Sequence, residues 1–134
     1  MNRFFDTNIL VYAFLDDPRR ARAQEILAEG GSISAQTLNE FTNVSRRKHN
    51  RDWPEIERAL QIIRDYVDAI APLTEQTHDR ALALARDHGL SFYDALILAA
   101  ALEAGCDTLF TEGMQDGRVV EGLTIRNPFR EGAP

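Results

Sequence analysis

The sequence predicts an α/β protein whose mainly parallel sheet carries helices on both faces. Short segments typical of buried strands alternate along the chain with longer segments whose apolar residues recur at helical spacing. Strands connected through helices run parallel, and the connecting helices cover the sheet. The length of 134 residues fits one domain, because domains most often contain about 100–150 residues. We assign the domain to residues 1–129 and expect residues 130–134 to form a short flexible tail.

Four segments are typical of short buried strands, at residues 3–5, 32–35, 108–111 and 123–125. A helical pattern begins directly after the first of them, at Asp6. Four longer segments match helices, at residues 37–48, 55–67, 75–88 and 92–104. Pro54 suits a first helical turn, Thr74 can cap the third of these helices, and Gly89 can end it.

The composition is that of a globular protein, with 44% hydrophobic and 27% charged residues. The N-terminal residues lack the apolar run of a signal peptide, and no stretch approaches the roughly 18 uncharged apolar residues of a membrane helix. We therefore expect a cytoplasmic protein that does not enter a membrane.

The net charge of −6 argues against nonspecific coating of nucleic acid, which needs a broadly positive surface. Any contact with nucleic acid must therefore be local, and one candidate is the basic run from Arg46 to Arg51. The same run also fits the solvated end of a helix, where cations interact favourably with the negative end of the macrodipole. Charge alone leaves both interpretations open.

Asp6 is the most informative residue, because it stands where the first strand ends and a helical pattern begins. Loops that leave the carboxyl ends of strands in α/β sheets converge on one crevice, where ligands and metals are held. Glu40 lies at the border between the apolar and polar faces of its helix, although a lone glutamate there is usually solvated. Asp94 lies in the first turn of a nearly all-apolar helix, where a buried charge needs a partner or a metal. A capping box with Ser91 is the alternative explanation for Asp94.

A fourth acidic segment, Thr111-Glu112-Gly113-Met114-Gln115-Asp116, follows the last residues of a predicted strand. By itself it is an ordinary turn, since Gly, Asp and Thr are common in loops. Acids at two strand ends and on the first turn of a buried helix would form a negative pocket if these ends meet. Such a pocket suits Mg²⁺ or Mn²⁺, because both prefer oxygen ligands and retain several waters.

Four short motifs carry a resemblance to a known family. They are Phe5-Asp6-Thr7-Asn8-Ile9-Leu10, Thr37-Leu38-Asn39-Glu40-Phe41, Phe92-Tyr93-Asp94-Ala95-Leu96-Ile97 and Leu109-Phe110-Thr111-Glu112. In this order and at this spacing they resemble the acidic signatures of PIN-domain ribonucleases, and more narrowly those of the VapC-type toxins of bacterial toxin–antitoxin pairs. The resemblance spans nearly the whole chain.

The resemblance implies a three-layer α/β/α PIN-like domain that cleaves single-stranded RNA. Residues equivalent to Asp6, Glu40 and Asp94 would gather Mg²⁺ or Mn²⁺, and a metal-activated water would attack the phosphodiester in line. Asp6 and Asp94 would be the direct metal ligands, and Glu40 would bind through water or orient the nucleophile. Supporting hydrogen bonds would come from Thr7, Asn8 and Thr111.

The chain departs from the family pattern in its last motif. Related toxins usually carry Asp two positions after the Thr or Ser, where this chain has Gly113. Glu112 and Asp116 are the two available replacements, and we assign the fourth catalytic position to Asp116. A non-catalytic PIN-like module that only binds RNA or a partner is the alternative function.

The resemblance also implies partners and gives the basic run a function. An acidic protein that cleaves RNA needs a local cationic guide, and Arg46, Arg47 and Lys48 leave the helix that carries Glu40. We therefore predict that these three cations contact the substrate. The family implies an RNA substrate, single-stranded or structured, a cognate antitoxin protein and a homodimer.

Two other α/β families fit less well. A receiver domain needs a carboxylate pair after its first strand and a lysine near its last, whereas the only lysine here is Lys48. A haloacid-dehalogenase-like phosphatase needs Asp-x-Asp after its first strand, and Asn8 occupies the second position.

Overall fold

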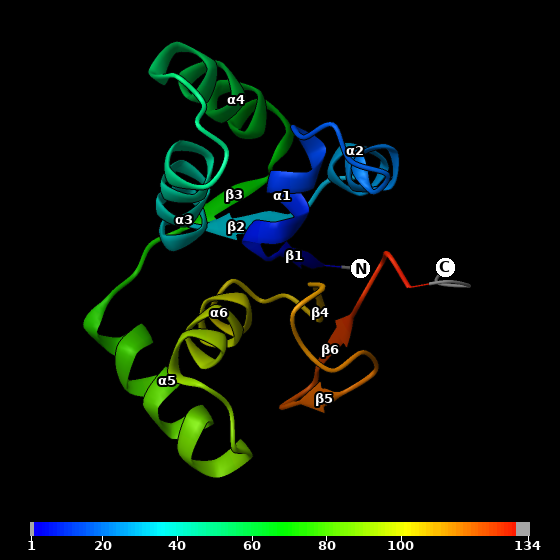
Figure 1. Cartoon of the computed structure of the whole chain (residues 1–134). Helices are drawn as coiled ribbons and strands as arrows, with labels where there is room; N and C mark the ends of the chain where they lie inside the picture. The colour runs from blue at the N-terminus through cyan, green and yellow to red at the C-terminus, as the bar shows by residue number, and fades with distance from the viewer. Residues whose placement is uncertain (1, 131–134) are drawn as a thin grey trace.

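The structure is a computed structural model that describes residues 2–130. Its strands are β1 (Arg3–Phe5), β2 (Ser32–Ser34), β3 (Ala69–Ala71), β4 (Thr108–Phe110), β5 (Val119–Val120) and β6 (Leu123–Arg126). Its helices are α1 (Thr7–Ala13), α2 (Arg20–Ala28), α3 (Ala35–Arg47), α4 (Trp53–Tyr66), α5 (Glu75–His88) and α6 (Phe92–Glu103). Figure 1 shows how the two sets are arranged.

The strands form one six-stranded sheet in the order β3-β2-β1-β4-β6-β5. All neighbours pair parallel except β5, which runs antiparallel to β6. The central pair, β1 and β4, is in register from Arg3 opposite Thr108 to Phe5 opposite Phe110. One step further on, the Asp6 amide still donates to the Phe110 carbonyl at 2.9 Å, which holds Asp6 at the carboxyl edge of the sheet. The predicted mainly parallel sheet is confirmed.

Helices cover both faces of this sheet and complete three α/β/α layers. Helices α1 to α4 lie on one side, and α5 and α6 lie on the other (Figure 1). Because side chains alternate along a strand, neighbouring residues enter different layers. Phe4 packs in the core with α5 and α6, whereas Phe5 packs in the core with α1 to α4. Leu109 and Phe110 on β4 divide in the same way.

Local capping interactions set where the helices leave the sheet. The Ser34 hydroxyl accepts from the Thr37 amide and the Thr37 hydroxyl accepts from the Ser34 amide, so α3 starts directly at the end of β2. Thr74 caps α5 with the same type of box, and Gly89 ends that helix at a φ of 66°, which glycine adopts without strain. Pro54 lies in the first turn of α4. The predicted roles of Pro54, Thr74 and Gly89 are confirmed.

Several elements differ from the prediction. Strand β2 is one residue shorter than expected because Ala35 already belongs to α3, which begins two residues before the expected start. Helix α2 and strands β3 and β5 have no counterpart in the prediction. Helix α2 alternates arginines and alanines and lacks a strong apolar stripe, β3 is a largely exposed edge strand, and β5 has only two residues.

The sheet and its two helical layers extend along the chain from Arg3 to Arg126. The tail expected at residues 130–134 lies outside the described residues except for Arg130, whose guanidinium donates to the Asp116 carboxylate at 2.6 Å. Within residues 2–130, no helix is both long and apolar enough to cross a bilayer.

Candidate functional site

Asp6 is built into the point where β1 becomes α1. Its Oδ1 accepts from the Thr7 amide at 2.7 Å and caps α1, and its Oδ2 accepts from the Thr111 hydroxyl at 2.7 Å. Thr111 directly follows β4, the strand beside β1. The carboxylate is therefore held by backbone and side-chain donors from two adjacent strand ends, and it is only 8% exposed.

The pKa of the Asp6 carboxyl is raised above its usual range. Burial is the main cause, and the negative charges of Glu40 and Asp94 act in the same direction. The hydrogen bonds from Thr111 and Thr7 oppose them but do not reverse the shift. Asp6 thus carries its negative charge in a largely buried place, and among the described residues it forms no ion pair.

Glu40 comes to the same place from α3. Its Oε2 accepts from the Thr7 hydroxyl at 2.7 Å, and its Oε1 accepts from the Gln36 side chain at 3.1 Å. Thr7 thus bridges two acids, because its amide donates to Asp6 and its hydroxyl donates to Glu40. Glu40 is half-buried and oriented by the chain, unlike an ordinary solvated glutamate.

Asp94 approaches from the opposite helical layer, on the first turn of α6. The α6 N-terminus is capped by Ser91, whose hydroxyl accepts from the Asp94 amide at 3.4 Å. This bond uses the backbone of Asp94 and not its carboxylate. Among the described residues the Asp94 carboxylate has no hydrogen-bond or ion-pair partner, although the side chain is half-buried. Capping therefore explains Ser91 but leaves the acid at position 94 unexplained.

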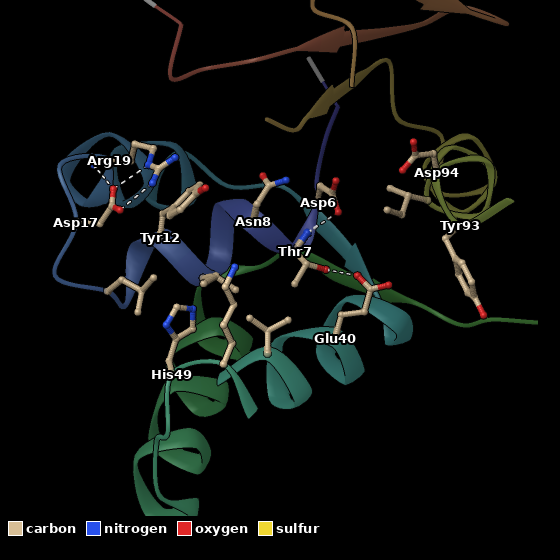
Figure 2. A pocket seen from close by; sticks show the side chains of 15 residues that line it. Asp6, Thr7, Asn8, Tyr12, Asp17, Arg19, Glu40, His49, Tyr93 and Asp94 are labelled. Carbon is tan, nitrogen blue, oxygen red and sulfur yellow. Dashed lines mark hydrogen bonds and ion pairs between the residues drawn. The ribbon is translucent and has the colours of Figure 1, made fainter. Parts of the chain in front are cut away.

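The three acids line one pocket of about 470 Å³ at the carboxyl edge of the sheet. In Figure 2, Asp6 and Glu40 lie between Arg19 and His49 on one side and Asp94 and Tyr93 on the other. The structure thus brings together side chains from a strand end, from α3 and from α6.

A second polar cluster borders the same pocket, and the sequence did not reveal it. The Arg19 guanidinium donates to both carboxylate oxygens of Asp17, each at 2.8 Å, and to Glu112 at 3.0 and 3.1 Å. It also lies 3.8 Å from the centre of the Tyr12 ring, and the Tyr12 hydroxyl donates to Glu112 at 2.6 Å. Arg19 lowers the pKa of Asp17 to about 2. In this cluster both acids, Asp17 and Glu112, are paired with the same cation, Arg19.

The structure does not bring Asp116 into the pocket. Its carboxylate accepts from the Asn127 amide at 2.8 Å and from the Arg130 guanidinium at 2.6 Å, and these bonds lower its pKa. The other replacement, Glu112, is held by Tyr12 and Arg19 as described above. Neither acid is directed at Asp6, so the acid-bearing pocket contains three carboxylates beside the Asp17–Arg19 pair.

The basic run divides into two parts. Lys48 and His49 line the pocket, and among the described residues neither forms an ion pair. Arg46 instead lies over the Trp53 ring at 4.8 Å and donates to a backbone carbonyl. Arg46 and Arg47 occupy the last turn of α3 and do not line the pocket.

A divalent cation is compatible with the donors of this pocket. Across residues 2–130, no three His, Cys, Asp or Glu side chains are close enough to form a closed metal centre. Mg²⁺ and Mn²⁺ do not need one, since they bind through one or two carboxylates and keep several waters. The available donors are carboxylate oxygens, and the pKa of Asp6 is raised first by burial and then by the neighbouring charges of Glu40 and Asp94. The residues fit an open, partly hydrated site.

A three-layer α/β/α fold with acids gathered at the carboxyl edge of a parallel sheet defines a class of site suited to phosphate chemistry on a metal. The family comparison agrees with this geometry. The PIN domain profile matches residues 3–115, and the chain belongs to the PIN domain family. The predicted three-layer PIN-like fold is confirmed.

Solved structures with the same fold include several toxin–antitoxin proteins. A chain of a toxin–antitoxin complex from Klebsiella pneumoniae is 24% identical, with a TM-score of 0.73 and coverage of 96% of this chain and 98% of that chain. VapBC2 from Rickettsia felis, bound to a DNA fragment from its promoter, is 22% identical, with a TM-score of 0.68 and coverage of 95% and 98%. The Mycobacterium tuberculosis toxin VapC20, which cleaves the sarcin–ricin loop, is 20% identical, with a TM-score of 0.67 and coverage of 81% and 87%. No curated protein matches the chain.

Proposed function

We propose that this chain is a metal-dependent endoribonuclease that cleaves single-stranded RNA and acts as the toxin of a toxin–antitoxin pair. The observation that carries the proposal is the convergence of Asp6, Glu40 and Asp94 on one pocket, where burial and the other two charges raise the pKa of Asp6. Like charges gathered where they are partly or fully buried destabilise a protein, so their convergence favours a role in binding a cation.

Each acid has a distinct role in this proposal. Asp6 and Asp94 hold Mg²⁺ or Mn²⁺ directly, and Glu40, which is already oriented by Thr7, positions the attacking water and accepts its proton. The bound cation neutralises charge on the phosphate and lowers the pKa of a water. Asp116 is left out of the catalytic group because its carboxylate is engaged with Asn127 and Arg130.

Lys48 is the proposed cationic contact to the RNA backbone. It borders the acids and has no ion-pair partner among the described residues, whereas Arg46 is directed onto Trp53. Replacing a phosphate contact weakens binding for all sequences and reduces the salt dependence of binding by about one phosphate. Lys48→Ala should therefore reduce the salt dependence of RNA binding more than Arg46→Ala or Arg47→Ala does. Equal salt dependence in the three variants would mean that the basic run is only the solvated end of a helix.

RNA cleavage tests the enzymatic proposal directly. Purified protein, free of any antitoxin, is incubated with single-stranded RNA in Mg²⁺, in Mn²⁺ and in excess chelator, beside Asp6→Ala and Asp94→Ala. We expect cleavage only by the parent protein and only with metal. Intact RNA with the parent protein in Mn²⁺ would reject the nuclease, and retained RNA binding in the same sample would support a non-catalytic PIN-like module instead.

The toxin role is supported by fold neighbours that are toxin–antitoxin complexes. An apolar groove of about 650 Å³ between α1, α2 and α4 gives an antitoxin segment a place to bind, with Phe14, Leu27 and Ile62 among its walls. The gene beside this one should then encode a small DNA-binding protein whose co-expression suppresses the growth defect caused by this chain. Suppression that survives Ile62→Asp would argue against the groove.

The resemblance also leads us to propose a cytoplasmic homodimer. Light scattering of the purified protein should then give twice the chain mass of 15.1 kDa. A monomer at all concentrations would reject the dimer without affecting the nuclease.

A further inference from the structure

Tyr93 is an aromatic residue in the candidate active site that none of the roles above uses. It lies in the first turn of α6, directly before Asp94, and lines the acidic pocket. It is 66% exposed, more than any other large hydrophobic side chain among the described residues. Its one aromatic neighbour among the described residues is Phe92, in a T-shaped arrangement with ring centres 5.8 Å apart. A large aromatic surface is therefore left in water beside the acids.

Packing does not explain this residue. Tyr12, the other tyrosine of the pocket, is covered by Arg19 at 3.8 Å, and its hydroxyl is bonded to Glu112. Tyr93 has neither a cation over its ring nor, among the described residues, a hydrogen bond to its hydroxyl. Capping of α6 is performed by Ser91. The two tyrosines thus differ, since one is integrated into the fold and the other has a free face.

The charges along the pocket give it a direction. In Figure 2, His49 lies on one side of Asp6 and Glu40 and Tyr93 lies on the other, and Lys48, the chain neighbour of His49, lines the same pocket. Arg19 is on the cationic side too, but Asp17 and Glu112 already neutralise it. A strand that crosses the acids would therefore meet an available cation before them and an exposed aromatic ring after them.

Single-stranded RNA has the chemistry to match this order. Its phosphates bind cations, and its unpaired bases expose π faces that stack on aromatic side chains, whereas a duplex hides those faces. We propose that Tyr93 stacks on an unpaired base of the substrate next to the cleaved phosphate, while Lys48 contacts the backbone on the other side. The inference rests on the proposed ribonuclease function and adds the reason for a single-stranded substrate.

Conservative and disruptive substitutions of Tyr93 test the stacking. Tyr93→Phe and Tyr93→Trp keep a π face and should keep kcat/KM within about threefold, whereas Tyr93→Leu should lower it about 5- to 150-fold, the range that loss of one base stack produces. The loss should appear in KM more than in kcat. Leu82→Ala is the surface control, since Leu82 is 54% exposed on α5 and does not line the pocket.

Oligonucleotides with one abasic nucleotide separate stacking from a general structural effect. Binding is measured by fluorescence anisotropy in a Glu40→Gln background, which keeps both proposed direct metal ligands. The abasic nucleotide is moved along the strand, and at one position it should weaken binding by the protein that keeps Tyr93. At that position the Tyr93→Leu variant should bind the intact and abasic strands equally well.

The outcomes distinguish this inference from the nuclease proposal. Cleavage by the parent protein together with unchanged binding and kcat/KM in Tyr93→Leu would overturn the stacking alone. Binding that depends on Tyr93 without cleavage by the parent protein would overturn the nuclease and keep the stacking. A parent protein that neither binds nor cleaves single-stranded RNA would overturn both.

Discussion

Two groups of carboxylates meet at the same pocket and differ in what neutralises them. Asp17 and Glu112 share Arg19, which holds both through short charge-assisted hydrogen bonds and lowers the pKa of Asp17 to about 2. Asp6 is grouped with Glu40 and Asp94 instead, and burial together with these negative neighbours raises its pKa. The acids of the first group are ion-paired with Arg19, whereas among the described residues no acid of the second group forms an ion pair.

This difference separates a structural role from a functional one. A paired acid fastens parts of the chain to each other, here the segment before α2 and the loop after β4. Acids that are gathered without a partner oppose folding, because each charge raises the energy of the others. A bound cation would reverse that effect. Changing the charges of the two groups should therefore have opposite consequences for stability.

The largest effect is expected at Asp6. Asp6→Asn should lower kcat/KM by at least about 10³-fold, because a metal ligand contributes several kcal/mol to the transition state. The same substitution should raise the Tm of the metal-free protein at neutral pH. The carboxyl group favours folding below its usual pKa of 3.8 and opposes it as pH rises through its raised folded-state pKa. Asn still caps α1. The gain in Tm should therefore be complete above the raised folded-state pKa of Asp6 and should vanish below pH 3.8.

Asp17→Asn is the matched control for this result. The folded-state pKa of Asp17 is lowered to about 2, so its contribution to stability is present above 3.8 and is lost as pH falls toward that folded-state value. Asp17→Asn should thus lower the Tm at neutral pH and have no effect in strong acid. Thermal unfolding of both variants between acid and neutral pH, in chelator, measures the two signs. Two shifts of the same sign would remove the contrast between the groups.

The hydrogen bond from Thr111 to Asp6 gives the next largest effect. The Thr111 hydroxyl donates to Asp6 Oδ2 at 2.7 Å. This hydrogen bond and the one from the Thr7 amide keep the pKa of Asp6 from rising further. Thr111→Val has nearly the same shape and should lower metal affinity and activity about 10- to 100-fold. The acidic limb of the pH–rate profile should move to higher pH, because Asp6 then holds its proton more tightly. Thr111→Ser should restore both, and a Ser variant as poor as Val would point to packing.

The sequence predicted the unpaired group, Asp6, Glu40 and Asp94, better than the paired group around Arg19, for a physical reason. Asp6 and Asp94 stand at element starts that the local pattern reveals, and a parallel sheet brings such starts to one edge. The Arg19 cluster has no local pattern. Its members come from α1, the turn before α2 and the loop after β4, as much as 100 residues apart in the Tyr12–Glu112 bond. Asp17 and Arg19 are near neighbours in the chain, but only tertiary structure brings Glu112 to Arg19 and Tyr12.

Asp116 shows that a local pattern can also assign to the site a residue that the structure places elsewhere. Its position in an acidic loop after a strand is the property that also identified Asp6. A strand exit does not determine where the loop goes next, and this loop folds back so that Asp116 accepts from the Asn127 amide. Spacing predicted the carboxyl edge of the sheet, but it did not predict the path of the chain beyond it.

Gly113 offers a way to extend the unpaired group by one acid. A Cβ at this position would lie 3.8 Å from the Thr111 hydroxyl oxygen and 3.9 Å from the Asn8 side-chain nitrogen, which is ordinary contact, and its φ is not in the left-handed region. Gly113→Asp should therefore fold and add a carboxylate beside Asp6. We expect about a tenfold gain in Mg²⁺ affinity, measured by calorimetry, and a lower Tm in chelator. Gly113→Asn, equal in size and neutral, should show neither change.

The smallest effect is expected at Asp116. Asp116→Asn removes the ion pair with Arg130 but retains an acceptor for the Asn127 amide. Exposed ion pairs contribute little, and the carboxylate is directed away from the acids, so kcat/KM should change by less than about threefold. Gly113→Asp/Asp116→Asn should likewise bind Mg²⁺ as well as Gly113→Asp alone, because the two positions act independently. A loss of about 100-fold in the single Asp116 variant would instead mean that the loop after β4 rearranges to bring this acid to the metal.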